Sequence, residues 1–173
     1  YGILRWLDGV ETNFVNTTTA GDFCNTTTTG DCELRPEGGT PLAGILTSAN
    51  DYLDPINDAD SVRACRPYSV ILITDGVESC GGTPNAAAAA LLANGINTYV
   101  VGLAISGGSQ ALLNGIATAG GTDAGAVGGD TAYFANDRVT LAAGLSEIVR
   151  RSLRFETCNN LDDDCDMLVD EGV

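Results

Sequence analysis

The sequence contains no histidine and no lysine, so its eight basic residues are all arginine. These absences exclude histidine-based catalytic triads, lysine Schiff bases, Walker-type phosphate loops and histidine metal sites. Aromatic residues are also few, at 6% of the 173 residues, whereas the apolar fraction is ordinary for a globular protein. We therefore expect a globular domain that is not an enzyme.

Positive charge is scarce as a whole, and the formal net charge is −15. Binding to nucleic acid or to an anionic membrane needs basic patches that contact phosphate, so this charge argues against both kinds of partner. An acidic surface suits divalent cations instead. The sequence shows no signal peptide and no apolar stretch of membrane-spanning length, and we expect a mature or excised piece of a longer protein.

Six cysteines occur without the Cys-x-x-Cys spacing of zinc sites. An even number of cysteines beside long threonine-rich loops favours disulfides, and hence a secreted protein at an extracellular or cell-surface location. The sequence does not choose among the possible connectivities. Proximity along the chain suggests two pairs, and the third pair then needs a loop that folds back. In that order, the pairs are Cys24 with Cys32, Cys158 with Cys165, and Cys65 with Cys80.

The segment 68–76 is the most informative stretch of the chain. Its apolar run from Val70 to Ile73 stops abruptly at Asp75-Gly76. Such a run is typical of a strand that is buried on both faces, as in a parallel sheet. Ligands of open α/β sheets bind beyond the carboxyl ends of the strands, so Asp75 there would face a cation or a polar ligand. The alternative is that Asp75-Gly76 only turns the chain.

Helical and strand patterns alternate along the rest of the chain. An Asp-Gly pair links two apolar runs at 2–7 and 10–15, which predicts a hairpin, and a long loop follows over 16–39. The alternation predicts an α/β fold: a doubly wound, mostly parallel sheet with helices on both faces. The helices are expected at 41–53, 85–93, 109–119 and 138–153, and the strands at 69–74, 96–104 and 131–135.

Local signals give these helices expected caps and expected buried faces. Thr40 and Thr83 each precede a proline and are predicted N-caps, and Ser109 is a third. Apolar residues at helical spacing predict the buried faces of the first and last helices. For the first helix they are Leu42, Ile45, Leu46, Ala49 and Leu53, and for the last Val139, Ala142, Leu145, Ile148 and Val149.

Two stretches, Gly38-Gly39-Thr40-Pro41-Leu42 and Ile71-Leu72-Ile73-Thr74-Asp75-Gly76, resemble the von Willebrand factor type A domain, also known as the integrin I domain. The resemblance covers residues 1–154. It implies a metal-ion-dependent adhesion site (MIDAS) on one rim of the sheet, with Thr40 and Asp75 as ligands of Mg²⁺ or Ca²⁺. In that family an acidic group of a protein ligand fills the open coordination position of the metal.

The sequence departs from this family in one large respect, because it has no Asp-x-Ser-x-Ser motif. In the family this motif ends the first strand, which lies centrally between the strands that match 2–7 and 69–74. It also supplies most of the direct metal ligands. We therefore expect the central position to be filled by an upstream segment of a longer precursor or by a donor strand from another chain.

The tail, residues 155–173, carries alternating carboxylates inside a cysteine pair. Such spacing can surround a calcium ion with oxygen ligands, although charge runs are more usually solvated. The tail resembles the Cys-Asn-Gly-x-Asp-Asp-Asp-Cys-Asp-Gly-x-x-Asp-Glu metal-binding repeats of secreted bacterial proteins. Asn160 and Met167 replace glycines of that pattern, and a Cβ disfavours positive φ. The expected ligands are Asp162, Asp164, Asp166, the Leu168 carbonyl, Asp170 and Glu171.

These features together predict an extracellular, metal-dependent adhesion or protein-binding domain with a calcium-binding tail. The alternative is a structural subunit or tip component of an extracellular fibre or pilus-like assembly, completed by a donated strand. Two further acidic residues, Asp51 and Glu78, are expected to be solvated surface charges.

Overall fold

The computed structural model describes residues 39–63, 66–122, 129–153, 158–160, 162–164 and 167–170. The chain divides into two compact units, Tyr1–Gly39 and Thr40–Val173. The predicted hairpin at 2–15 and the loop that follows it lie outside the described residues. The predicted boundary between 154 and 155 stays a prediction.

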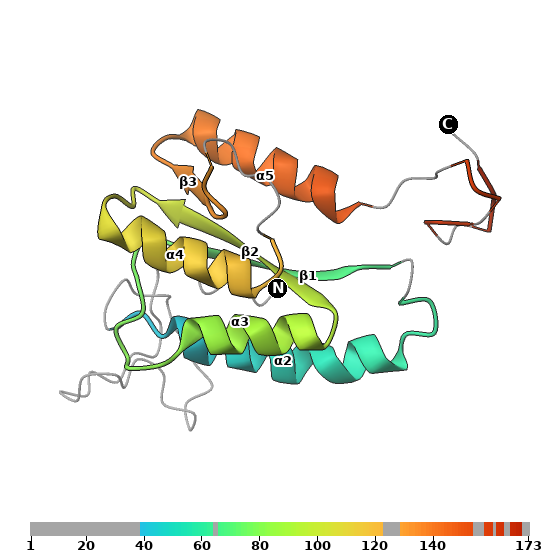
Figure 1. Ribbon diagram of the computed structural model, residues 1–173, viewed down its shortest axis with the longest axis horizontal. Coiled ribbons are helices and arrows are strands. Elements are labelled where there is room, and N and C mark those ends of the chain that lie inside the picture. Colours follow the sequence, from blue (N-terminus) through green and yellow to red (C-terminus); the bar gives the residue numbers. More distant parts are fainter. Residues whose placement is uncertain are drawn as a thin grey trace, which may run out of the picture. The chain divides into compact units, whose positions relative to one another are not determined.

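Helices and strands alternate through the second unit, which confirms the prediction of a mixed α/β fold (Figure 1). None of the helices described is both long enough and apolar enough to span a bilayer. The elements are α2 (Leu42–Ala59), β1 (Tyr68–Thr74), α3 (Pro84–Ala93), β2 (Ile96–Leu103), α4 (Gly108–Ala119), β3 (Tyr133–Ala135) and α5 (Arg138–Ser152).

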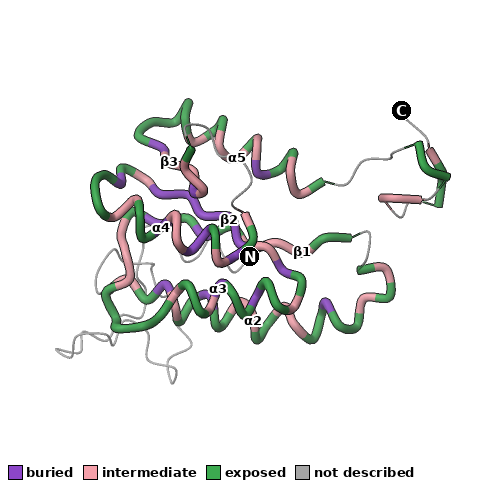
Figure 2. The backbone as a smooth tube through the Cα atoms, viewed as in Figure 1, coloured by how far each residue is buried: buried purple, intermediate pink, exposed green. Residues whose placement is uncertain are grey.

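The three strands form a parallel sheet in the order β1-β2-β3. Tyr68 lies opposite Ile96 at the start of the β1–β2 ladder, and Val101 lies opposite Tyr133 in the β2–β3 ladder. The central strand β2 is buried along most of its length, whereas β1 is only partly covered (Figure 2). Within the described part of the chain, β1 has a strand neighbour on one side and an open edge on the other.

Helices pack on both faces of this sheet. On one face, residues of α2, α3 and α4 join the core around Leu72 and Val100. On the other face, Ile148 of α5 packs against Tyr99 and Val101 of β2. Alternate residues of β2 thus enter two separate cores, which explains why its sequence is almost continuously apolar.

Helix α2 is longer than predicted, because it continues past Leu53 to Ala59 with Pro55 in its interior. Proline lacks an N–H and normally interrupts a helix. Here the last turns are held by tertiary contacts: Leu53 packs against the core, and the buried Asn57 side chain donates to the Asn94 carbonyl over 2.7 Å. Packing therefore outweighs the local signal on which the shorter prediction rested.

Of the three predicted N-caps, those at Thr40 and Ser109 are wrong, and the one at Thr83 is confirmed in its position only. The N-cap position of α2 is Pro41 rather than Thr40, and no side chain caps that helix from this position. Thr83 does occupy the N-cap position of α3, but its hydroxyl accepts no capping hydrogen bond. Ser109 lies inside α4, which begins after Gly107.

Two predicted buried faces are only partly confirmed. Leu46 of α2 and Ile148 of α5 are fully buried, as expected. Ile45 on α2 and Val149 on α5 are each 51% exposed, and Val139 is more exposed still, so their predicted burial is wrong in this structure. These side chains lie on flanks of α2 and α5 that no other described element covers.

Candidate functional site at the carboxyl end of β1

A tight turn follows β1 and presents Asp75 at the edge of the sheet. The Thr74 hydroxyl donates to the Gly76 carbonyl over 2.9 Å and accepts from the Gly76 N–H over 3.1 Å. This pair of hydrogen bonds closes the turn locally. Asp75 itself is exposed, and none of the described residues forms a hydrogen bond or ion pair with it. Its carboxylate is therefore available to a ligand.

Thr40, the other predicted rim residue, lies against the same turn. Its N–H donates to the Ser79 hydroxyl over 2.6 Å, and its carbonyl accepts from the Ser79 N–H over 3.1 Å. A Cβ placed on Gly76 would lie 3.1 Å from Thr40 Oγ1, so glycine permits this close approach. The structure thus brings Thr40 beside Gly76, the residue that follows Asp75, although Thr40 and Gly76 are 36 positions apart in sequence.

Glu78 holds this rim together, which corrects the expectation that it is a solvated surface charge. Its carboxylate accepts from the N–H of Ala43 over 2.8 Å, of Cys80 over 2.8 Å and of Gly82 over 3.3 Å. The Ala43 hydrogen bond is the largest of the causes that hold the pKa of Glu78 below its usual value. Glu78 therefore caps the first turn of α2 in place of Thr40.

The described residues of this rim offer only some of the oxygen ligands that a divalent cation needs. Asp75 and Thr40 offer one carboxylate and one hydroxyl, whereas the Glu78 oxygens are already used by backbone N–H groups. Hard divalent cations need about six oxygen ligands, some of which can be water. No cluster of three or more acidic or cysteine side chains suited to a metal occurs in the part of the chain that the structure describes. Further ligands would have to come from elsewhere.

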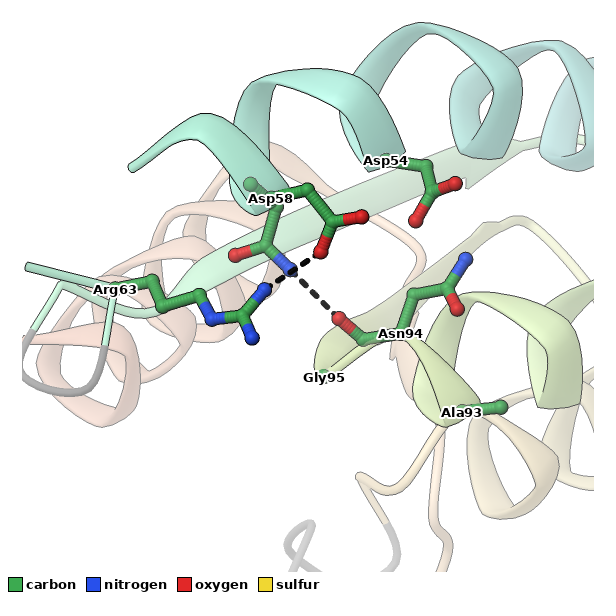
Figure 3. Close-up of a pocket in the computed structure, with 7 residues that line it drawn as sticks. Asp54, Asp58, Arg63, Ala93, Asn94 and Gly95 are labelled. Atoms are coloured by element: carbon green, nitrogen blue, oxygen red, sulfur yellow. Dashed lines mark hydrogen bonds and ion pairs between the residues drawn. The ribbon is translucent and has the colours of Figure 1, made fainter. Parts of the chain in front are cut away.

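A cavity of about 620 Å³ lies at the end of α2 and α3 that is away from the rim (Figure 3). Arg63 and Asp58 form an ion pair of 2.6 Å beside it. This pair neutralises one of the two carboxylates that line the cavity, and no sequence motif marks the site. The lining residues are Asp54, Asn57, Asp58, Arg63, Ala93, Asn94 and Gly95.

In the tail, two of the predicted calcium ligands already organise the backbone. Asp170 Oδ1 accepts from the N–H groups of Asn159 and Asn160 over 2.9 and 3.1 Å. Asp162 Oδ2 accepts from the Met167 N–H over 3.0 Å. The carboxylates thus draw the two ends of the segment together.

The two positions at which the tail departs from the repeat both have the backbone of glycine. Asn160 has a φ of 62° and Met167 a φ of 77°. Asparagine tolerates this left-handed conformation, whereas an unbranched apolar residue adopts it rarely. Both positions thus have the backbone conformation that glycine adopts most readily. Asp164 and Leu168 are described, whereas Asp166 and Glu171 lie outside the described residues.

The cysteine pairing stays a prediction. Cys80 and Cys158 are exposed, and neither is joined by a disulfide to another described residue. The four other cysteines, Cys24, Cys32, Cys65 and Cys165, lie outside the described residues.

Two curated relatives come from Bacillus subtilis (strain 168), and both are uncharacterized proteins. YwmC is 37% identical over 86 residues, which are 50% of this chain and 35% of YwmC. YwmD is 40% identical over 68 residues, which are 39% of this chain and 28% of YwmD. The chain thus spans about a third of the length of the curated relatives it matches. No protein-family model and no solved structure matches it.

Proposed function

We propose that the rim beyond β1 is part of a divalent-cation site through which a von Willebrand A-like domain binds a protein ligand. The observation that carries this proposal is the approach of Thr40 Oγ1 to Gly76, beside the exposed and unpaired Asp75. These two residues are the ones that the family resemblance assigns to the metal. The parallel α/β sheet is compatible with that fold.

The ion that suits such a rim is Mg²⁺, with Ca²⁺ as the other candidate. Mg²⁺ is commonly bound by one or two carboxylates and keeps several waters, so a site with few protein ligands can hold it. One of those waters can give way to an acidic group of a protein partner. The remaining protein ligands would come from polypeptide outside the described residues, in place of the absent Asp-x-Ser-x-Ser loop.

A titration with Mn²⁺ as a paramagnetic substitute for Mg²⁺ tests this site in the complete polypeptide. Asp75→Asn should weaken binding at least about tenfold, because it removes the carboxylate charge while conserving size. Asp51→Asn is the matched control, since Asp51 is an exposed aspartate within α2 and away from the rim. Equal Mn²⁺ affinity in Asp75→Asn and the parent would refute the proposal.

We further propose that the tail binds calcium and that the protein works outside the cytoplasm. The support for the calcium site is the alternation of carboxylates and the left-handed backbone at Asn160 and Met167. Disulfide-compatible cysteine usage supports the location. The sequence contains no histidine and no lysine, the residues on which many catalytic mechanisms depend, so we propose no enzymatic activity.

A second candidate function is that of a structural subunit in an extracellular fibre. One observation favours it: in the described part of the chain β1 has an open edge, and open edges pair readily with strands of other molecules. Light scattering coupled to size-exclusion chromatography distinguishes the two. A concentration-dependent series of oligomers supports the fibre, whereas a stable monomer supports the ligand-binding domain.

A further inference from the structure

The cavity of about 620 Å³ beside the ends of α2 and α3 is lined by no residue of the rim or of the tail. Its volume is within the range of about 300–1,000 Å³ that is typical of sites for small ligands. Asp54, Asn57 and Asp58 line it from α2, and residues 93–95 line it from the end of α3 (Figure 3). It therefore has the size of a small-molecule site, and its lining residues indicate the class of ligand that it suits.

The α2 wall of this cavity is held in place by hydrogen bonds between two helices. Asp54, Asn57 and Asp58 lie on one face of α2, because residues three and four positions apart are neighbours on a helix. The Asn57 side chain donates to the Asn94 carbonyl over 2.7 Å, and the Asn94 side chain donates to Asn50 Oδ1 over 3.1 Å. The polar groups of the wall are thus positioned before a ligand arrives, which lowers the entropic cost of binding.

Asn57 presents an acceptor that has no partner. The residue is only 6% exposed, and none of the described residues donates a hydrogen bond to its Oδ1. Among the described residues, Thr98 Oγ1 is the one side-chain oxygen or nitrogen that is both fully buried and without a partner. Asn57 Oδ1 therefore keeps some accessible surface, and it reaches that surface in the cavity that Asn57 lines. Because polar groups of buried residues are normally paired, this oxygen suits a donor on a ligand.

Negative charge also gathers at this cavity. Asp54 is half-buried, and none of the described residues forms a hydrogen bond or an ion pair with it. Asp58 is paired with Arg63 over 2.6 Å. Both helices end here, α2 at Ala59 and α3 at Ala93, and each helix C-terminus has a partial charge of about −0.5. The cavity thus has an excess of negative charge and of hydrogen-bond acceptors.

Three classes of ligand do not suit this lining. An anion would meet two carboxylates, and the guanidinium in the lining, that of Arg63, is already paired with Asp58. A bare metal ion is far smaller than the cavity, and the described residues contain no group of three acidic or cysteine side chains that could hold one. No aromatic side chain lines the cavity, so a nucleobase would find no ring on which to stack. What remains is an organic cation that carries several N–H donors.

We propose that this cavity binds a small aliphatic cation with two or more ammonium groups, of the diamine and polyamine class. One ammonium group would donate to the Asp54 carboxylate and to Asn57 Oδ1, because hydrogen bonds between charged groups are the strong ones. The aliphatic chain would lie against Ala93 and Gly95, where a Cβ on the glycine would meet nothing within 4 Å. The net charge of −15 attracts such a cation from solution. This site is independent of the rim and of the tail.

Calorimetric titration of the complete polypeptide with diaminohexane tests the site. Asp54→Asn should weaken binding at least about tenfold, because it removes a charged acceptor while conserving size. Asp51→Asn is the matched control: it removes the same charge from an exposed position of the same helix that does not line the cavity. This control should change the affinity by less than about threefold. Equal losses in the two variants, or no heat at millimolar diaminohexane, would overturn the proposal.

Arg63 supplies a second test, of opposite sign. Its ion pair with Asp58 leaves less negative charge for a bound cation. Arg63→Gln should therefore strengthen diaminohexane binding by about threefold or more. Arg138→Gln is the matched control, because Arg138 is exposed at the start of α5 and does not line the cavity. Equal changes in the two variants would overturn the assignment of the cation to this cavity.

Two further ligands separate recognition of N–H donors from simple attraction of charge. Hexamethonium has the same hexamethylene chain and the same charge as diaminohexane, but its quaternary ammonium groups have no N–H donor. It should bind at least about tenfold more weakly, because the acceptors of the cavity would stay unpaired. Hexanediol has the chain and donors without the charge and should show no binding at millimolar concentration. Equal affinity of either compound and diaminohexane would overturn the proposal.

The side-chain amide resonances of asparagine locate the bound cation without any substitution. Those of Asn57 and Asn94 should shift on addition of diaminohexane and saturate with the calorimetric curve, because both residues line the cavity. Asn114 is the control, since its side chain donates to Asp130 over 2.8 Å and accepts from the Thr131 N–H over 3.0 Å, before β3. Equal shifts of all three amides, or no shift at Asn57, would overturn the proposal.

Discussion

At the scale of single residues, Glu78 differs from every other acidic side chain described near the rim. Its two carboxylate oxygens accept backbone N–H groups from α2 and from its own loop. It therefore joins two segments that the sequence separates by 35 positions. A residue that satisfies several otherwise unpaired N–H groups stabilises the loop that presents Asp75.

We predict that Glu78→Ala lowers the thermal unfolding midpoint by several degrees and weakens cation binding at Asp75. Asp51→Ala is the control, because Asp51 is exposed on α2. The two residues look alike in sequence, and only the structure separates them. If Glu78→Ala and Asp51→Ala had the same unfolding midpoint, Glu78 would not have the structural role assigned to it.

The same contact predicts a pH dependence. The folded-state pKa of Glu78 is lowered from 4.5, chiefly by the Ala43 hydrogen bond. The stabilisation is therefore fully present above about pH 4.5 and is lost as the pH falls through the lower folded-state pKa. The free energies of unfolding of the parent and of Glu78→Gln, measured as a function of pH, should converge in acid and differ above pH 4.5. A difference that does not change with pH would contradict this assignment.

Sequence reasoning at this scale predicted Asp75 and Thr40 as rim residues from two local signals, a strand that ends in Asp-Gly and a Gly-Gly-Thr-Pro helix start, and the structure brings Thr40 close to Gly76. It missed Glu78, because no local pattern distinguishes a glutamate that will meet a distant helix N-terminus. It also placed Thr40 at a cap, although Pro41 has that position. Contacts between remote segments depend on the fold, which local signals do not encode.

At the scale of elements, the contact between α4 and β2 depends on a glycine, which has no side chain. A Cβ on Gly120, which ends α4, would lie 2.5 Å from the Cβ of Thr98 and 3.0 Å from its carbonyl oxygen. Backbone atoms cannot move aside as a flexible side chain can. Glycine therefore sets how closely the end of α4 approaches the central strand.

We predict that Gly120→Ala lowers the free energy of unfolding by about 1–3 kcal/mol, as expected for overpacking. Gly108→Ala at the other end of α4 is the matched control, because a Cβ there would meet nothing within 4 Å. That change should be neutral or stabilise by about 0.4–1 kcal/mol, since alanine restricts the unfolded chain. Urea unfolding measures both free energies. If Gly120→Ala did not lower the free energy of unfolding, the end of α4 would be able to move away from β2 to accommodate the added Cβ.

The types of the elements were predictable because apolar residues recur with different periods in strands and in helices. The start of α3 and the start of β2 follow from Pro84 and Gly95. The buried faces of α2 and α5 were less predictable in a specific way. Ile45 and Val149 have the spacing of buried residues but are exposed here. Helical spacing predicts which residues share one face, but it does not say how much of that face other elements cover.

At the scale of the whole molecule, the sheet and the acidic tail are separate features of one chain. The sequence predicted the parallel α/β arrangement because strands and helices alternate. It did not predict the internal geometry of the tail, in which Asp162 and Asp170 bind backbone N–H groups. Short acidic segments have no core that would impose one structure, so their geometry depends on specific hydrogen bonds or on an ion.

The tail yields the last prediction, which separates a calcium site from a simple acidic run. Calorimetric titration with Ca²⁺ in an Asp75→Asn background, which removes the rim site, should still show binding, at about 10⁻⁴–10⁻³ M as in extracellular modules. Asp164→Ala should weaken it at least about tenfold, because this carboxylate belongs to the alternating set. Asp163→Ala is the control of equal charge: it binds the Asn159 side chain and is outside that set. Equal losses in the two variants would mean that only the net charge attracts the ion, and no heat at millimolar Ca²⁺ would refute the site.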